Sequence, residues 1–391
     1  MKRIALLSFF FFLSILVLPP IVANAADTVK IGMVTSVTGP LSAVFKSMAD
    51  AAKPTTEIMN KRGGITVNGK RYDVEIVTED DQSSPPGAIS ATNKLLQAGI
   101  KFLIAPIFPP NNIAIANICE EAKLIRVAPS QLDPNQFPPE QRYVFNAWLT
   151  IYNAPPLYDY LKMKYPQVKK VAFVSPDDPG PIYARKNCLN EAKKRGIEVV
   201  CDEAYATTTQ DFYPILTKVL ALKPDAIDCV GGIPPWIQGI VNHSRELGFN
   251  GPIYSAAPFG GPHLINKMLK PEFANDVFEG APDVTSDKMP PVVREIRDLM
   301  KKSGLVMNFD SVMVLSALWP IMQGIEAAQS FDTDKVVVGM ENMESFDTPW
   351  GKARWAGEEI NGSNHMAKLD TVPITRIMNG QIEFEWVEQP K

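Results

Sequence analysis

Histidine and cysteine, which supply many of the metal ligands and activated nucleophiles of proteins, are scarce in this chain. Its three histidines lie in different segments, without the spacing of metal ligands: His243, His263 and His365. His243 falls in a predicted helix, where we interpret it as a packing or surface residue. We expect no metal centre and no cofactor.

The four cysteines are widely separated and form no C-x-x-C motif: Cys119, Cys188, Cys201 and Cys229. We interpret them mainly as buried apolar residues. A disulfide stays open, with Cys188 and Cys201 the nearest pair in sequence, because spacing does not determine connectivity.

Motifs of several enzyme classes are also missing. The sequence has no G-x-S-x-G, H-E-x-x-H, Walker A or G-x-G-x-x-G pattern. The acidic run Glu79-Asp80-Asp81 is interpreted as the end of a strand and the approach to a helix, not as a catalytic pair. We therefore expect a protein that is not an enzyme. A periplasmic hydrolase is the alternative of another class, which a turnover assay separates from a binding protein.

Long runs of basic charge are absent as well. The 39 basic and 43 acidic residues are mixed along the chain, for a formal charge of -4. Nucleic-acid binding requires a basic face that displaces counterions. The composition therefore excludes nucleic acid as the expected partner.

What the chain does have, at its start, is a leader-like segment. Met1-Lys2-Arg3 precedes an apolar run over residues 4–22, and Ala23-Asn24-Ala25 has the small-x-small spacing of a cleavage site. This pattern predicts a signal peptide over residues 1–25; a retained membrane anchor is the alternative. No cysteine near the cleavage site offers a lipid attachment point. We expect a soluble periplasmic protein of 366 residues with a formal charge of -6.

The remaining chain alternates between predicted strands and helices in two rounds. The first round has strands at 28–34, 72–77, 101–105 and 124–127, and helices at 41–61, 86–97 and 111–122. The second has strands at 170–174, 198–201, 226–230 and 252–254, and helices at 153–165, 182–195, 211–222 and 235–247. Residues 290–343 are predicted mostly helical, and 353–387 form short strands. The fold class is therefore α/β, with two doubly wound parallel-sheet lobes and a cleft between them.

Several segments resemble the leucine-isoleucine-valine-binding protein family of ABC transporters. They are spread over nearly the whole chain: Ile31-Gly32-Met33-Val34, Thr38-Gly39-Pro40, Ile58-Met59-Asn60-Lys61-Arg62-Gly63-Gly64-Ile65, Glu79-Asp80-Asp81-Gln82, Asp211-Phe212, Arg245-Glu246-Leu247-Gly248-Phe249 and Thr348-Pro349-Trp350-Gly351. No single segment is specific, but their order and spacing together are.

The resemblance implies a type I periplasmic binding protein fold with a three-crossing hinge. It places residues 27–149 and 281–348 in lobe 1, and 150–280 and 349–391 in lobe 2. It also implies a monomeric clamp that captures a small organic ligand and delivers it to the permease subunits of an ABC importer. A membrane sensor that recognises the closed clamp is the alternative partner.

The ligand is inferred from departures from the family pattern. In amino-acid-binding members, hydroxyl-bearing turns after the third and fourth strands and an acidic residue on the second lobe hold the ligand. Here residues 106–112 contain no hydroxyl, Leu132 stands where threonine is expected, and residues 254–259 contain no acid. A buried ammonium needs matched partners. We therefore expect an aromatic or aliphatic carboxylate; a branched-chain or other amino acid is the alternative.

The candidate ligand-binding residues lie in these turns, in the first crossing and after strands of the second lobe: Phe108, Pro109, Asn111, Ser130, Gln131, Leu132, Trp148, Tyr152, Ile233, Trp236, Ala257 and Phe259. Aromatic and apolar walls would supply affinity, while Ser130, Gln131, Asn111, Asn112 and helix-start amides would orient polar groups. The alternative is that Phe108, Leu132 and Ile233 only pack against neighbours and that the prolines only fix turns.

Overall fold

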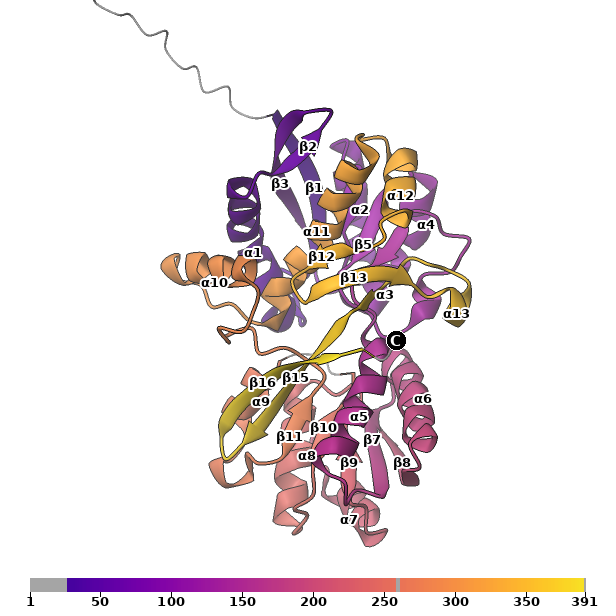
Figure 1. Ribbon diagram of the computed structural model, residues 1–391, viewed down its shortest axis with the longest axis vertical. Helices are drawn as coiled ribbons and strands as arrows, with labels where there is room; N and C mark the ends of the chain where they lie inside the picture. The colour runs from indigo at the N-terminus through magenta and orange to yellow at the C-terminus, as the bar shows by residue number, and fades with distance from the viewer. Residues whose placement is uncertain (1–26, 258–260, 390–391) are drawn as a thin grey trace, which may run out of the picture.

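The chain forms two lobes, each built on one sheet with helices on both faces (Figure 1). The computed structural model describes residues 27–257 and 261–389, so the expected signal peptide lies outside the described part. The first lobe contains a nine-stranded sheet and the second a seven-stranded sheet. This arrangement confirms the predicted two-lobed α/β fold.

The first sheet has the strand order β12-β13-β14-β6-β5-β4-β1-β3-β2. Its strands are β1 (Asp27–Thr35), β2 (Ile65–Val67), β3 (Lys70–Asp80), β4 (Phe102–Ile104), β5 (Ile125–Ala128), β6 (Val144–Asn146), β12 (Phe346–Thr348), β13 (Gly351–Ala356) and β14 (Met366–Leu369). Its helices are α1 (Ser42–Lys61), α2 (Pro85–Gln97), α3 (Pro109–Ala114), α4 (Ala116–Glu121), α10 (Pro291–Lys302), α11 (Phe309–Ala328), α12 (Thr333–Glu341) and α13 (Glu358–Asn361).

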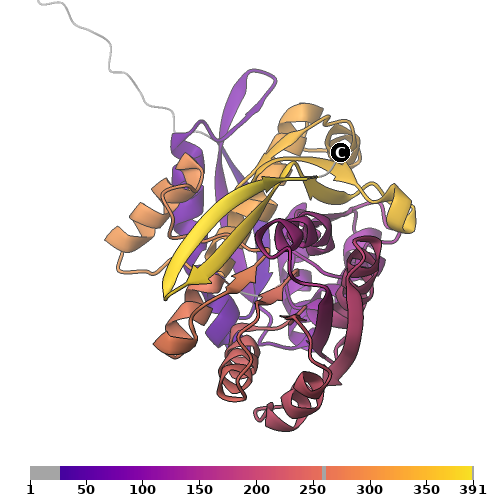
Figure 2. The same cartoon turned by 60° about the horizontal axis from the view of Figure 1, so that its bottom comes forward.

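The second sheet has the order β16-β15-β11-β10-β9-β7-β8. Its strands are β7 (Lys170–Pro176), β8 (Glu198–Tyr205), β9 (Ala226–Asp228), β10 (Ile253–Ser255), β11 (Val277–Glu279), β15 (Thr371–Met378) and β16 (Gln381–Glu388). Its helices are α5 (Ala154–Lys164), α6 (Pro179–Lys194), α7 (Tyr213–Ala221), α8 (Pro234–Glu246) and α9 (Pro262–Met268). Figure 2 shows the β15–β16 hairpin along one flank of this lobe.

Both sheets are parallel in the middle and antiparallel at an edge. Strands β3, β1, β4, β5 and β6 pair in parallel, as do β8, β7, β9, β10 and β11. The central strands are short apolar runs because helices cover both of their faces, as in the fully buried β4. The edge hairpins β2–β3 and β15–β16 are antiparallel, a feature the sequence pattern did not separate from the parallel strands.

The last crossing between the lobes differs from the expected one. We expected residues 349–391 to belong to lobe 2, but β13 pairs with β12 and β14 pairs with β6 in the first sheet. The first member of the second sheet after this point is β15. The final crossing therefore lies between Leu369 and Thr371, and the expected boundary at residue 348 is wrong.

One expected helix differs from the structure, and another helix is apolar enough to resemble a membrane span. The helix expected over 111–122 begins at Pro109 and is divided at Ile115 into α3 and α4. Helix α11 is apolar enough to span a membrane by length and composition, yet 72% of its most apolar stretch is buried in the protein. It is the central helix of the first lobe, where it packs against α1 and α12.

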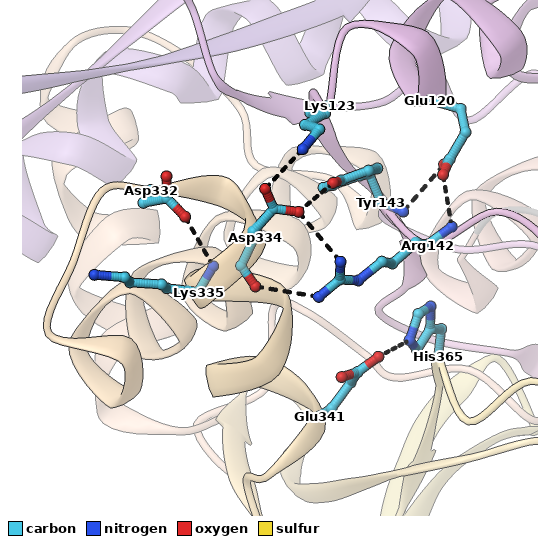
Figure 3. Close-up of polar contacts among 9 residues, drawn as sticks. All are labelled: Glu120, Lys123, Arg142, Tyr143, Asp332, Asp334, Lys335, Glu341 and His365. Carbon is cyan, nitrogen blue, oxygen red and sulfur yellow. Dashed lines mark hydrogen bonds and ion pairs between the residues drawn. The ribbon is translucent and has the colours of Figure 1, made fainter.

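A polar cluster fastens α12 to the first sheet, as Figure 3 shows. The Asp334 carboxylate accepts hydrogen bonds from Lys123 Nζ at 2.8 Å, from Arg142 at 3.2 Å and from the Tyr143 hydroxyl. The hydrogen bond and charge of Lys123 hold the pKa of Asp334 below its usual value. Glu120 accepts the backbone N–H groups of Arg142 and Tyr143 at 2.9 and 3.1 Å. The Asp334 contacts thus join α12 to the segments that precede β5 and β6, from which the second lobe separates it in sequence.

The cysteines and His243 have structural environments. All four cysteines are buried and unpaired, so Cys188 and Cys201 form no disulfide. The His243 ring stacks on Tyr213 with centroids 4.0 Å apart, and its Nδ1 accepts the backbone N–H of Phe212 at 3.3 Å. His243 is therefore a packing residue, as interpreted from the sequence.

Candidate ligand-binding site

The carboxyl ends of the two parallel sheets face each other. The turn after β5 meets the start of α6: a β-carbon placed on Gly180 would lie 3.6 Å from Leu132 Cβ. On the other side of the interface, a β-carbon on Gly261 would lie 3.4 Å from Phe309 Cβ. The lobes therefore touch at this edge of the sheets, and we call this interface the cleft because ligands of such folds bind there.

Three aromatic rings gather where the first crossing meets the cleft. The ring centroid of Trp148 lies 5.8 Å from that of Phe309 and 5.1 Å from that of Trp350. Trp148 Nε1 donates to Asn153 Oδ1 at 3.2 Å, and Asn153 Nδ2 donates to the Gly280 carbonyl at 2.8 Å. The first and second crossings are thus linked through the Trp148 side chain, which is fixed in orientation beside the cleft.

The turn after β4 has a buried polar side chain that holds neighbouring turns together, and it does not present an open polar surface. Phe108 and Pro109 are half-buried at the start of α3. Asn111 is fully buried, and its Nδ2 donates to Asp81 Oδ2 at 2.8 Å. Asp81 also accepts the Ser36 hydroxyl at 2.6 Å. This network joins the ends of β1, β3 and β4 and engages the Asn111 Nδ2 group, while the buried Asn111 Oδ1 has no partner among the described residues.

The turn after β5 offers one free hydroxyl. Gln131 is fully buried, and its Nε2 donates to the Ile107 carbonyl at 2.8 Å, so this side chain also supports the turn. Ser130 is 7% exposed, and its hydroxyl has no hydrogen-bond partner among the described residues. Of the polar residues predicted for this turn, Ser130 is the one available to a ligand. Leu132 packs towards Gly180 across the cleft.

In the second lobe, the residues predicted to bind the ligand lie in different environments. Ala257 is fully buried, and its carbonyl accepts the Gly231 N–H at 3.0 Å, so the turns after β9 and β10 are joined at the cleft. Ile233 is half-buried at the start of α8. The Trp236 ring packs edge-on against Tyr205, with centroids 5.7 Å apart. Phe259 lies outside the described residues.

The structure places Tyr152 outside this cluster. Its hydroxyl donates to Glu359 Oε1 at 3.0 Å, and Lys368 Nζ lies 5.6 Å from the centre of its ring. The side chain therefore lies beside α13 and β14, on the flank of the hinge.

Sequence reasoning missed an acidic residue at the start of α11. Asp310 follows Phe309 directly, is 7% exposed and accepts no hydrogen bond from another described residue. Burial raises the pKa of Asp310 to about 7. Phe309 and Trp350 were missed as site residues too, although Trp350 belongs to one of the segments that carried the family resemblance. No signal in the sequence places the start of a helix near residue 310 beside a turn near residue 261.

The acidic run Glu79-Asp80-Asp81 lies at the end of β3, as interpreted from the sequence. Asp80 accepts the backbone N–H groups of Val37 and Thr38 at 2.9 and 3.2 Å, and the Thr38 hydroxyl at 2.5 Å. Its carboxylate thus holds the turn between β1 and α1. Both oxygens face backbone or hydroxyl donors, which leaves no catalytic pair with Asp81.

Comparison with known proteins agrees with this geometry. The model of the family "Periplasmic binding protein" matches residues 28–370. The chain therefore belongs to the periplasmic binding protein family. Within it, the relatives place the chain among the Leu/Ile/Val-binding type: it is a solute-binding protein and not an enzyme.

Curated relatives and solved structures show the same class. The chain is 25% identical over 335 residues to the leucine-, isoleucine-, valine-, threonine- and alanine-binding protein of Pseudomonas aeruginosa, covering 84% of this chain and 85% of that one. A branched-chain amino acid transporter protein of Streptococcus pneumoniae, solved with isoleucine, superposes with a TM-score of 0.75 at 20% identity, over 93% of this chain and 100% of that one. A solute-binding protein of R. palustris, solved with 4-hydroxybenzoate, superposes with a TM-score of 0.71 at 20% identity, over 93% and 98%. One fold thus holds both amino acids and aromatic acids.

Proposed function

We propose that this protein captures a small aromatic or aliphatic carboxylate outside the cytoplasmic membrane and delivers it to the permease of an ABC importer. The observation that carries the proposal is the group of three buried rings, Trp148, Phe309 and Trp350, which pack together close to the contact between the lobes. Aromatic walls stabilise a flat apolar ligand by burial and stacking. The R. palustris protein solved with 4-hydroxybenzoate supports the proposal because its fold is the same.

The proposed site keeps part of the set expected from the sequence. Ser130 donates its free hydroxyl to the ligand carboxylate, Leu132 and Trp148 form the wall of the first lobe, and Ala257 forms the floor of the second. Phe108, Pro109 and Ile233 lie at the rim. Asn111 and Gln131 act through the turns they hold. Trp236 and Tyr152 lie outside the proposed site.

A thermal-shift panel tests the ligand class, because a ligand that binds only the folded protein raises the melting temperature by mass action. The panel contains 4-hydroxybenzoate, benzoate, short aliphatic acids, leucine and valine. We expect the carboxylates that lack an α-ammonium to give the largest shifts. A strong shift with leucine or valine and none with the other acids would contradict the ligand class while leaving the family intact.

Two tryptophan variants then test the wall. Trp148→Phe keeps a ring but removes part of the stacking surface, and we expect roughly a tenfold loss of affinity, about 1.4 kcal/mol, by isothermal titration. Trp236→Phe is the matched control, because the Trp236 ring packs against Tyr205. The ligand affinity of this variant should stay within about twofold of that of the unmodified protein. Equal effects of both variants would count against the aromatic wall.

An α-amino acid is the second candidate, and Asp310 is the observation that favours it. A buried carboxyl without a partner is stabilised as a carboxylate when an ammonium group binds beside it. Asp310→Asn should then abolish amino-acid binding and leave carboxylate binding unchanged. If the variant binds leucine as the original protein does, Asp310 has no part in ligand recognition.

A further inference from the structure

A pocket on the flank of the hinge lies apart from the cleft. It has a volume of about 360 Å³, and its walls come from the first crossing, from α13 and β14 of the first lobe and from α6 of the second. In Figure 1, α13 lies above α6 at the right of the molecule. The α6 residues in the pocket run from Tyr183 to Asn190, one to three turns beyond Gly180, which faces the cleft. This hinge-flank pocket is therefore a separate space.

The floor of the hinge-flank pocket is apolar and aromatic. It consists of Tyr152 and Tyr183 with the aliphatic groups of Ile151, Pro155 and Ile360. The tyrosine hydroxyl of Tyr152 is fixed because it donates to Glu359 Oε1 at 3.0 Å. Two ring faces and three aliphatic side chains form a surface suited to a small flat molecule.

The charged side chains of the pocket are two lysines and one glutamate. Lys186 and Lys368 form no ion pair with any residue in the described part of the chain. The one carboxylate, that of Glu359, is already engaged: Oε1 accepts from Tyr152, and Oε2 accepts the Gly357 N–H at 3.2 Å. The two ammonium groups come from opposite lobes, Lys186 from α6 and Lys368 from β14. An anion in the pocket would therefore face two ammonium groups against one carboxylate, a net positive charge, beside the side-chain amides of Asn187 and Asn190.

We propose that the hinge-flank pocket is a second binding site, which takes a small aromatic carboxylate between Lys186 and Lys368 with its ring against Tyr152 and Tyr183. The carboxylate forms charge-assisted hydrogen bonds with the two ammonium groups. The ring replaces water on the aromatic floor. This site does not depend on which ligand the cleft takes.

Occupancy of the hinge-flank pocket is coupled to lobe closure. Its walls belong to both lobes, so the distance between Lys186 and Lys368 changes when the lobes move about the crossings. A ligand that bridges them in the arrangement seen here binds this arrangement more tightly than an open one. By linkage, the same ligand increases the affinity of the closed cleft for its own ligand.

Fluorine NMR with 4-fluorobenzoate as the probe tests the site. The double variant Lys186→Ala/Lys368→Ala should lose one bound resonance, with at least a tenfold weaker dissociation constant for that resonance. The arginine pair Lys186→Arg/Lys368→Arg should retain it, because the charges remain. The control Lys169→Ala/Lys301→Ala removes two exposed lysines elsewhere and should change nothing.

The outcomes separate this proposal from that for the cleft. Trp148→Phe should weaken a cleft resonance and leave the hinge-flank resonance in place. If the cleft takes no carboxylate, one resonance remains and must still depend on Lys186 and Lys368. Unchanged binding in the alanine pair, or an equal loss in the control pair, would overturn the second site.

Discussion

The two lobes share one architecture, but Asp81 of the first lobe and two buried acids of the second differ in how many hydrogen bonds they accept. In the first lobe, Asp81 accepts the Ser36 hydroxyl, the Ser83 N–H and the Asn111 amide at 2.6 to 2.8 Å. In the second lobe, Asp228 accepts one hydrogen bond, from the Tyr158 hydroxyl at 2.8 Å, and its other oxygen has no partner among the described residues. Glu279 is 1% exposed, and neither of its oxygens has a partner there.

This difference separates a carboxylate that its donors hold in place, Asp81, from two carboxyl groups that are held by few donors or none, Asp228 and Glu279. Hydrogen bonds from three donors fix a carboxylate and the turns that supply the donors. A buried carboxyl with few donors is disfavoured in its charged form, so burial raises the pKa of Asp228 to about 7 and that of Glu279 well above its usual value. We infer that the Asp81 network holds preformed turns in the first lobe, and that Asp228 and Glu279 of the second lobe, together with Asp310 of the first, carry the response to pH.

The largest expected effect comes from breaking the network of the first lobe. Asp81→Ala leaves the Ser36, Ser83 and Asn111 donors without an acceptor in a buried site. Each unsatisfied buried group is destabilising, so we expect a loss of about 3 kcal/mol in the free energy of unfolding, measured with urea. Glu279→Ala is the counterpart in the second lobe and should be less harmful, because Glu279 holds no donor. Equal losses would remove the contrast between the lobes.

The next effect concerns pH. Because the folded-state pKa of Asp228 lies above its unfolded value, the folded protein binds more protons between about pH 4 and pH 7. Stability should therefore fall as the pH rises through this window, by about 2 kcal/mol between pH 5 and pH 8 from this group. Asp228→Asn keeps an acceptor for Tyr158 and should flatten this part of the profile. Urea titrations at several pH values measure the slope, and a slope that survives the substitution assigns it to other groups such as Asp310 or Glu279.

The smallest expected effect concerns the contact between the lobes. Gly180→Leu places a side chain against Leu132 where only a β-carbon has room, so it should oppose closure and weaken ligand binding about fivefold, roughly 1 kcal/mol. Gly180→Ala is the matched control, because a β-carbon there lies at an ordinary contact distance of 3.6 Å. X-ray scattering with saturating ligand should show a larger radius of gyration for the leucine variant. If the leucine variant closes fully, the contact between residues 180 and 132 does not limit closure of the lobes.

Much of the fold follows from local pattern. The alternation of short apolar strands with amphipathic helices predicted most of the elements from β1 to β10, since both patterns depend on residues close in sequence. The short strands β2 and β6 were not predicted. The antiparallel strands at the edges of the sheets were harder to predict from the sequence. Residues 351–369 continue the first sheet because β14 pairs beside β6, and no local feature of Met366–Leu369 identifies that distant partner.

The candidate site was predicted less completely than the fold. Trp148 and Leu132 lie at the interface between the lobes, as their positions after strands implied. Gln131 and Asn111 were expected to face a ligand, but their amides hold the turns instead. Tyr152 was expected in the cleft and lies in the hinge-flank pocket. The direction of a side chain in an irregular turn depends on packing that the local sequence does not specify.

The sequence by itself determined the class of this protein: the absence of catalytic motifs, the repeated β/α alternation and the ordered family segments are all properties of the chain read in one dimension. Only the tertiary structure decided which residues meet across the cleft, which acids are left without donors and where the last crossing lies. The physical reason is that the hydrogen bonds and contacts that settle these points join residues that lie tens to hundreds of positions apart, as Phe309 and Gly261 or Lys368 and Tyr152 do.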